Sequence, residues 1–138
     1  VNGNLATNSG GGIYNRVGSV GISSSTLSGN SATNNGGGIF NWNNGSLTLT
    51  SSTLSGNSAS NGGGIWNNSS VGISGSTLSG NSATNNGGGI YNSGSLSISG
   101  SIISSNTAFN GGAISNSGSL TLTSSTISSN TARYSGGG

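Results

Sequence analysis

The sequence predicts an all-β fold, a right-handed parallel β-helix (β-solenoid) with three strands per coil and about 25 residues per coil. The first observation is a repeat. The tetrapeptide Gly-Gly-Gly-Ile, or a near copy, returns at spacings of 26, 26, 25 and 24 residues. The second is a run of alternating apolar and polar residues in each repeat, which is typical of a half-buried strand. The third is that Gly, Ser and Asn, all poor helix formers, dominate the chain without any 3.6-residue period.

The repeat divides residues 1–138 into the coils of a single β-solenoid segment. Each full coil begins at the isoleucine that ends the glycine run. The expected pieces are a partial coil, 1–12, and the full coils 13–38, 39–64, 65–89, 90–113 and 114–138. Because the chain begins and ends inside a repeat, we expect it to be part of a longer chain or of a filament.

Every coil has the same order of elements, which residues 39–64 illustrate. A first short strand, Ile39-Phe40-Asn41, is followed by a polar turn of variable length. The alternating run 46–50 forms the second strand and the segment 52–59 the third, after which a turn rich in Gly and Asn closes the coil. Length differences fall only in the turns, since an insertion inside a strand would move its side chains to the opposite face.

Stacking should bury the apolar side chains, because one coil cannot bury them alone. In the second full coil the predicted core residues are Ile39, Leu47, Leu49, Leu54 and Ala59, and the equivalent residues of the other coils continue each column. The glycines are expected at turns that need positive φ or close approach of two backbones.

Two columns of asparagine are the most regular polar feature. The first column is Asn4, Asn30, Asn57, Asn81, Asn106 and Asn130. The second is Asn15, Asn41, Asn67, Asn92 and Asn116. We expect both to form structural ladders, in which stacked amides bond to each other and to turn backbone groups. A polar ligand-binding row is the alternative.

An aromatic column follows the inward isoleucines and should face outward. Its members are Tyr14, Phe40, Trp66 and Tyr91. They form either a stacking ladder that stabilises contacts between coils or a contact strip for sugar rings or another copy of the chain. The sequence leaves both interpretations open.

Charged side chains are almost absent. Arg16 and Arg133 are the only ones, and the chain has no Asp, Glu, His or Cys. Two separate arginines make no basic face, so we expect no nucleic-acid partner. No apolar run is long enough for a transmembrane helix. Low net charge favours association, so self is an expected partner.

Short motifs resemble those of chlamydial polymorphic outer membrane protein repeats. Residues 111–114 read Gly-Gly-Ala-Ile, like the GGAI tetrapeptide of that family. Its second motif, FxxN, has the counterparts Leu27 to Asn30 and Ile103 to Asn106, with Leu or Ile in place of Phe. The chain also resembles the repeats of long bacterial surface proteins with right-handed, pectate-lyase-like β-helices. These resemblances imply an extracellular or cell-surface passenger or fibre.

The residue inventory argues against catalysis. Some β-helices are polysaccharide lyases or hydrolases, which need carboxylates for acid/base chemistry or calcium binding. This chain has no carboxylate side chain and no His or Lys to activate a serine. We therefore expect no enzyme activity, no catalytic residue, no metal site and no cofactor.

The expected function is a non-catalytic structural repeat of an extracellular bacterial filament or surface fibre that assembles by stacking coils head to tail, with lateral contacts as a further mode. The alternative is a carbohydrate- or surface-binding adhesin passenger, with polysaccharide as partner. A third alternative is an ice-binding face made of outward Ser and Thr rows, such as Thr48 and Thr50 with Thr121 and Thr123. Glycine at positions 21 and 72 interrupts one of these rows.

Overall fold

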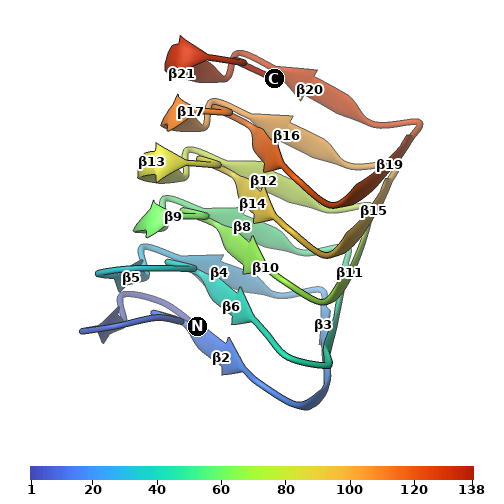
Figure 1. Cartoon of the computed structure of the whole chain (residues 1–138). Coiled ribbons are helices and arrows are strands. Elements are labelled where there is room, and N and C mark those ends of the chain that lie inside the picture. The colour runs from blue at the N-terminus through green and yellow to red at the C-terminus, as the bar shows by residue number, and fades with distance from the viewer.

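Twenty-one short strands and no helix make up the chain. The structure, a computed structural model, describes residues 1–138. Figure 1 shows the strands wound into coils that lie one above another, with the N-terminal coil at one end of the stack and the C-terminal coil at the other. The predicted all-β solenoid is confirmed; its right-handed sense stays a prediction.

Strands at the same place in successive coils pair in parallel and form four sheets. Sheet I consists of β2 (Ile13–Asn15), β6 (Ile39–Asn41), β10 (Ile65–Asn67), β14 (Ile90–Asn92) and β18 (Ile114–Asn116). Sheet II consists of β3 (Gly18–Ser23), β7 (Gly45–Thr50), β11 (Ser70–Ser74), β15 (Ser95–Ser99) and β19 (Ser119–Thr123). Sheet III consists of β4 (Thr26–Ser28), β8 (Thr53–Ser55), β12 (Thr77–Ser79), β16 (Ile102–Ser104) and β20 (Thr126–Ser128). Sheet IV consists of β1 (Leu5–Ala6), β5 (Ser31–Ala32), β9 (Ser58–Asn61), β13 (Ser82–Asn86), β17 (Thr107–Asn110) and β21 (Thr131–Ser135).

Each coil therefore has four strands, where the sequence predicted three. The segment predicted as one strand, 52–59, is divided between β8 and β9. The break is at Gly56, whose φ of 62° lies in the left-handed region and turns the chain. The residues at this place in the other full coils also have positive φ, even where serine replaces glycine, as at Ser105 and Ser129. The corner is thus a property of every full coil.

The register of the sheets places equivalent residues side by side. Ile65 is paired with Ile39 on one side and Ile90 on the other. Val71 is likewise flanked by Leu47 and Leu96. These isoleucine, leucine and valine columns form one buried cluster inside the coil, so four of the five predicted core columns are confirmed. Ala32, Ala59, Ala83 and Ala108 of the alanine column are buried as well but lie outside this cluster. Full burial of one such side chain contributes about 1.5–3 kcal/mol.

The glycine triplets allow the backbone of neighbouring coils to come close. In the copy at 36–38, Gly36 has a φ of 63°. A Cβ atom on Gly37 would overlap the backbone carbonyl oxygens of Ser58 and Gly63, which belong to the next coil. The triplet therefore combines the two requirements expected from the sequence, a left-handed turn and a close backbone contact.

Backbone pairing continues through the corners. Of 95 backbone hydrogen bonds, 51 lie outside the strands, and most of these join a turn to the equivalent turn of the next coil. The Ile39 amide, for example, donates to the Gly64 carbonyl at 2.9 Å. Coils are consequently joined along nearly their whole perimeter.

Candidate functional site

The first asparagine ladder lies at the corner between sheets III and IV. The Asn57 side-chain amide Nδ2 donates to Asn81 Oδ1 at 2.9 Å, and Asn81 Nδ2 donates to Asn106 Oδ1 at the same distance. Each Oδ1 also accepts the backbone N–H of the preceding Asn in the column, as Asn81 Oδ1 does from Asn57 at 3.0 Å. The ladder predicted from the sequence is present, and it satisfies the turn backbone as expected.

The second ladder lies where sheet I meets sheet II. Asn41 Nδ2 donates to Asn67 Oδ1 at 2.9 Å, and Asn67 Nδ2 donates to Asn92 Oδ1 at 2.7 Å. Asn41 also donates to the carbonyl of Gly45 at 3.1 Å, inside its own turn. No buried side-chain nitrogen or oxygen of the chain lacks a hydrogen-bond partner. Both columns are thus engaged in structure, which leaves the interior members little capacity to bind a ligand.

Sequence reasoning missed two further ladders. The first is formed by serines such as Ser52, whose backbone N–H donates to Ser76 Oγ at 3.1 Å while its own Oγ donates to the Thr50 carbonyl at 2.8 Å. The other is a third asparagine ladder, made of the residues that precede the glycine runs: Asn35, Asn61, Asn86 and Asn110. The recurring Asn-Gly-Gly sequence was the available signal for this third ladder.

The aromatic column lies on the outer face of sheet I, and its rings stack. Ring centroids are 5.0 Å apart for Tyr14 and Phe40, 4.7 Å for Phe40 and Trp66, and 5.9 Å for Trp66 and Tyr91. Phe40 is only 3% exposed, so this member is covered by its neighbours, although its side chain points outward. The stacking ladder is therefore present. A role of the strip in contact with a partner stays a prediction.

Trp42 extends this column and was not identified from the sequence. Its ring centroid lies 5.7 Å from those of both Phe40 and Trp66. Side chains alternate between the two faces of an extended chain, and Asn41 points inward. Its two neighbours, Phe40 and Trp42, could therefore have been predicted to point outward together. The two-residue insertion Asn43-Asn44, with φ of 50° and 68°, forms the turn that follows Trp42. Trp42 is 43% exposed and Tyr14 is 56% exposed.

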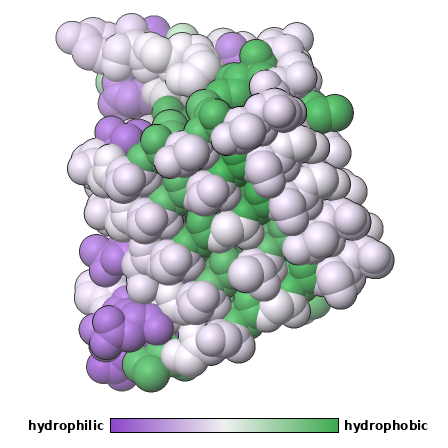
Figure 2. Space-filling view, turned by 90° about the vertical axis from the view of Figure 1, so that its right-hand side faces the viewer, coloured by the Kyte–Doolittle hydropathy of each residue, from purple (hydrophilic) through white to green (hydrophobic).

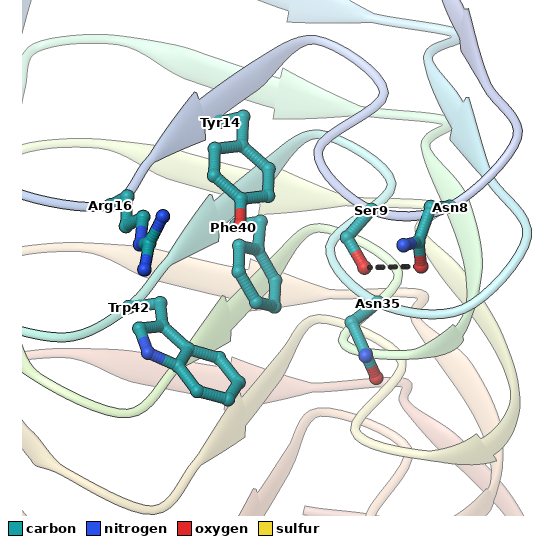
Figure 3. A pocket seen from close by; sticks show the side chains of 7 residues that line it. All are labelled: Asn8, Ser9, Tyr14, Arg16, Asn35, Phe40 and Trp42. Atoms are coloured by element: carbon teal, nitrogen blue, oxygen red, sulfur yellow. Dashed lines mark hydrogen bonds between the residues drawn. The ribbon is translucent and has the colours of Figure 1, made fainter.

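A hollow of about 290 Å³ opens beside these rings and is lined by seven residues (Figure 3): Asn8, Ser9, Tyr14, Arg16, Asn35, Phe40 and Trp42. Figure 3 shows Tyr14, Phe40 and Trp42 one below another, seen obliquely and not edge-on. Arg16 lies on one side of the rings, and Asn8, Ser9 and Asn35 lie on the other. This volume lies just below the usual range of small-molecule pockets, about 300–1,000 Å³.

The outer face of sheet II carries the predicted Ser and Thr rows. Figure 2 views this side of the molecule and shows pale, weakly polar residues in rows, with apolar residues between them. Thr48 is flanked on its two sides by Gly21 and Gly72, so one row loses its side chains at two levels. A shallow hollow lies at Gly72, beside Thr48, Ser97 and Ser99. An ice-binding role of this face stays a prediction.

The chemistry available on this surface is that of binding. The hollow beside Tyr14 combines apolar ring faces, amides, a hydroxyl and one guanidinium group. The chain contains no group of three or more His, Cys, Asp or Glu side chains. No segment forms a helix with the length and hydropathy needed to cross a membrane.

Comparison with protein families identified one model, the Chlamydia polymorphic membrane protein repeat, which matches residues 24–41 and 75–93. Each matched segment runs from sheet III through sheet IV into sheet I, and contains one Leu-Ser-Gly-Asn sequence and the Gly-Gly-Gly-Ile that follows it. The predicted resemblance to these repeats is confirmed. The match points to association with the outer membrane or the cell surface. Comparisons with curated proteins and with solved structures gave no match.

Proposed function

We propose that the chain is a non-catalytic structural repeat of an extracellular bacterial filament or surface fibre, assembled by stacking coils. The observation that carries this proposal is that one interface recurs at every level of the stack. Asparagine ladder bonds of 2.7–3.0 Å and in-register parallel strands join each full coil to the next. A repeated interface of this kind can extend a rod without new contacts.

The side-chain inventory supports a structural function. With no Asp, Glu, His or Lys, the chain lacks the side chains that usually act as general acids or bases at neutral pH. Nearly uncharged coils also lack the repulsion that keeps rods apart. The match to a membrane protein repeat favours placement of the fibre on the cell surface.

Elongation tests the proposal directly. The purified chain should form rods whose length grows with concentration in negative-stain images and in sedimentation velocity. Leu122, 43% exposed in the last coil, continues the core column above Ile98. Leu122→Lys should stop elongation because it places a charge in the coil-to-coil junction. Thr121→Lys, which changes the outward residue next to it, should leave elongation intact. A wild-type chain that stays monomeric at high concentration contradicts head-to-tail stacking.

A second candidate function is binding of carbohydrate by an adhesin passenger. It is favoured by the partly exposed Tyr14 and Trp42, since rings that are open to solvent beside amide groups suit the C–H faces and hydroxyl groups of sugars. Its test is retention of the intact chain on immobilised polysaccharides. Trp42→Ala is expected to reduce retention, whereas Phe109→Ala, which alters an aromatic residue on sheet IV, is not. Absence of retention on every polysaccharide tested would refute it.

A further inference from the structure

The third asparagine ladder has a direction, and it ends at the hollow. Asn110 Nδ2 donates to Asn86 Oδ1, Asn86 Nδ2 to Asn61 Oδ1, and Asn61 Nδ2 to Asn35 Oδ1, at 3.1, 2.9 and 3.2 Å. Every donor therefore points toward the N-terminal coil, opposite to the other two asparagine ladders. At the last step the residue paired with Asn35 is Ser9, not another asparagine. Asn35 lines the hollow, and its Nδ2 makes no hydrogen bond within the chain.

Asn8 presents a second unused donor to the same space. Its Oδ1 already accepts from Asn34 Nδ2 at 2.8 Å and from Ser9 Oγ at 3.4 Å (Figure 3). Asn8 Nδ2, like Asn35 Nδ2, has no acceptor in the chain. The amide oxygens beside the hollow are thus occupied while the amide N–H groups are free. A ligand that complements them must be rich in acceptors.

Arg16 adds a positive charge that the chain cannot neutralise with a side chain. Arg16 is exposed and lines the hollow, and the sequence contains no Asp or Glu. A second copy of this chain would likewise bring no carboxylate side chain to the guanidinium group. Because the favourable partner of an arginine is a carboxylate or phosphate group, charge complementarity favours a different, anionic molecule over self-association at this place.

We propose that the hollow bounded by Tyr14, Arg16, Asn35 and Trp42 binds an acidic saccharide, with a sugar carboxylate accepting from Arg16 on one side of the rings and sugar hydroxyl oxygens accepting from the free asparagine amides on the other side. The C–H face of the sugar ring lies against Tyr14 and Trp42, and buried Phe40 stacks with both of these rings. This inference rests on the second proposed function, carbohydrate binding, and specifies the chemical class of the ligand.

The test compares one polysaccharide in two charge states. The intact chain is run in native gels that contain polygalacturonate or its methyl ester, and Trp fluorescence is titrated with oligogalacturonates. We expect retardation by the acid form only. Arg16→Gln should lower the affinity about tenfold or more, since it removes a charge-assisted hydrogen bond. Asn35→Ser should lower it by about threefold or more by removing the ladder's free donor.

Arg133→Gln is the matched control. It changes the net charge by the same amount but alters the other arginine, which lies on β21 of sheet IV, and it should bind like the wild type. Circular dichroism verifies that each variant is folded. Equal losses in the two arginine variants would mean non-specific charge attraction and would overturn the inference. Equal binding of the methyl ester would overturn the acidic specificity while leaving carbohydrate binding in place. Binding of neither form, with self-association lost in Trp42→Ala, would identify the hollow as a contact between copies and overturn the inference.

Discussion

Replacement of Asn81 by leucine is the sharpest test of the asparagine ladder. Asn81 is 1% exposed and takes part in four hydrogen bonds through its side chain. In Asn81→Leu the buried Asn57 N–H loses its only acceptor, which costs about 1–3 kcal/mol. The other three lost bonds add to this, and burial of the leucine side chain offsets part of it. We expect a loss of about 2–4 kcal/mol in the free energy of unfolding, or roughly 10 °C in Tm.

The matched control for this change is Asn68→Leu. Asn68 is exposed, lies outside all the ladders, and makes a single side-chain hydrogen bond, from its Nδ2 to Ser93 Oγ at 3.5 Å. Its replacement should change stability by less than about 0.5 kcal/mol. Thermal and urea unfolding followed by circular dichroism measure both variants. If Asn81→Leu unfolds with the midpoint of the control, the ladder does not stabilise the coil stack and the reasoning is refuted.

Four other predictions concern stability. Gly37→Ala should destabilise the chain by about 3 kcal/mol or more, because its Cβ would overlap backbone atoms of the next coil. Gly72→Ala, with nothing within 4 Å of the added atom, should be neutral in the same unfolding assay. Phe40→Ala should cost about 2 kcal/mol or more, because Phe40 is enclosed by other rings, and a cost no larger than that of the exposed Phe109→Ala would contradict this. The Tm should change by less than about 2 °C between about pH 4.5 and 6.5, because stability follows pH only through groups that titrate differently on unfolding and the chain has no Asp, Glu or His. An acid-induced transition within that range would disprove this last expectation.

The core and two of the asparagine ladders could be predicted because they depend on periodicity alone. Parallel in-register stacking brings residues at equal places in the repeat into contact, so Ile39, Ile65 and Ile90 necessarily share a column once the coil length is known. The same argument places Asn57 beside Asn81. Neither conclusion requires knowledge of where the chain turns.

The number of strands per coil was harder to predict, because it depends on backbone angles. Ser55-Gly56-Asn57 is compatible with a continuous strand or with a corner, and the choice depends on the left-handed φ of Gly56. Serine at the same place in later coils, as at Ser105, also has a positive φ. Serine seldom adopts this conformation, so its presence in the sequence does not predict a corner. The turn at Gly56 and the turn at Ser105 have the same cause: each directs the asparagine that follows it inward, where its Oδ1 or its backbone N–H takes part in the ladder.

The hollow was not predicted for a different reason: several of the residues that line it depart from the repeat. Trp42 belongs to the coil with the inserted Asn43-Asn44, and position 9 has serine where the next four coils have asparagine. Residues that differ from the repeat belong to no column, so the periodicity of the sequence does not predict that they lie together. They become visible as a site only when the coils are stacked and the departures in three successive coils fall on the same side.

This contrast bears on where function can reside in a repeat protein. The ladders and core columns are nearly the same at every level, so they can join coils but cannot mark one level as different from another. A ligand that binds at one place needs a feature found at one place, and Arg16, Trp42 and the free end of the third ladder are of that kind. The direction of the third asparagine ladder connects the repeated structure to the hollow, because its three successive amide hydrogen bonds all point their donors toward Asn35. Polarisation along such a chain strengthens the terminal donor. The regular stack therefore gives the irregular hollow a directed hydrogen-bond donor that an isolated surface asparagine would lack.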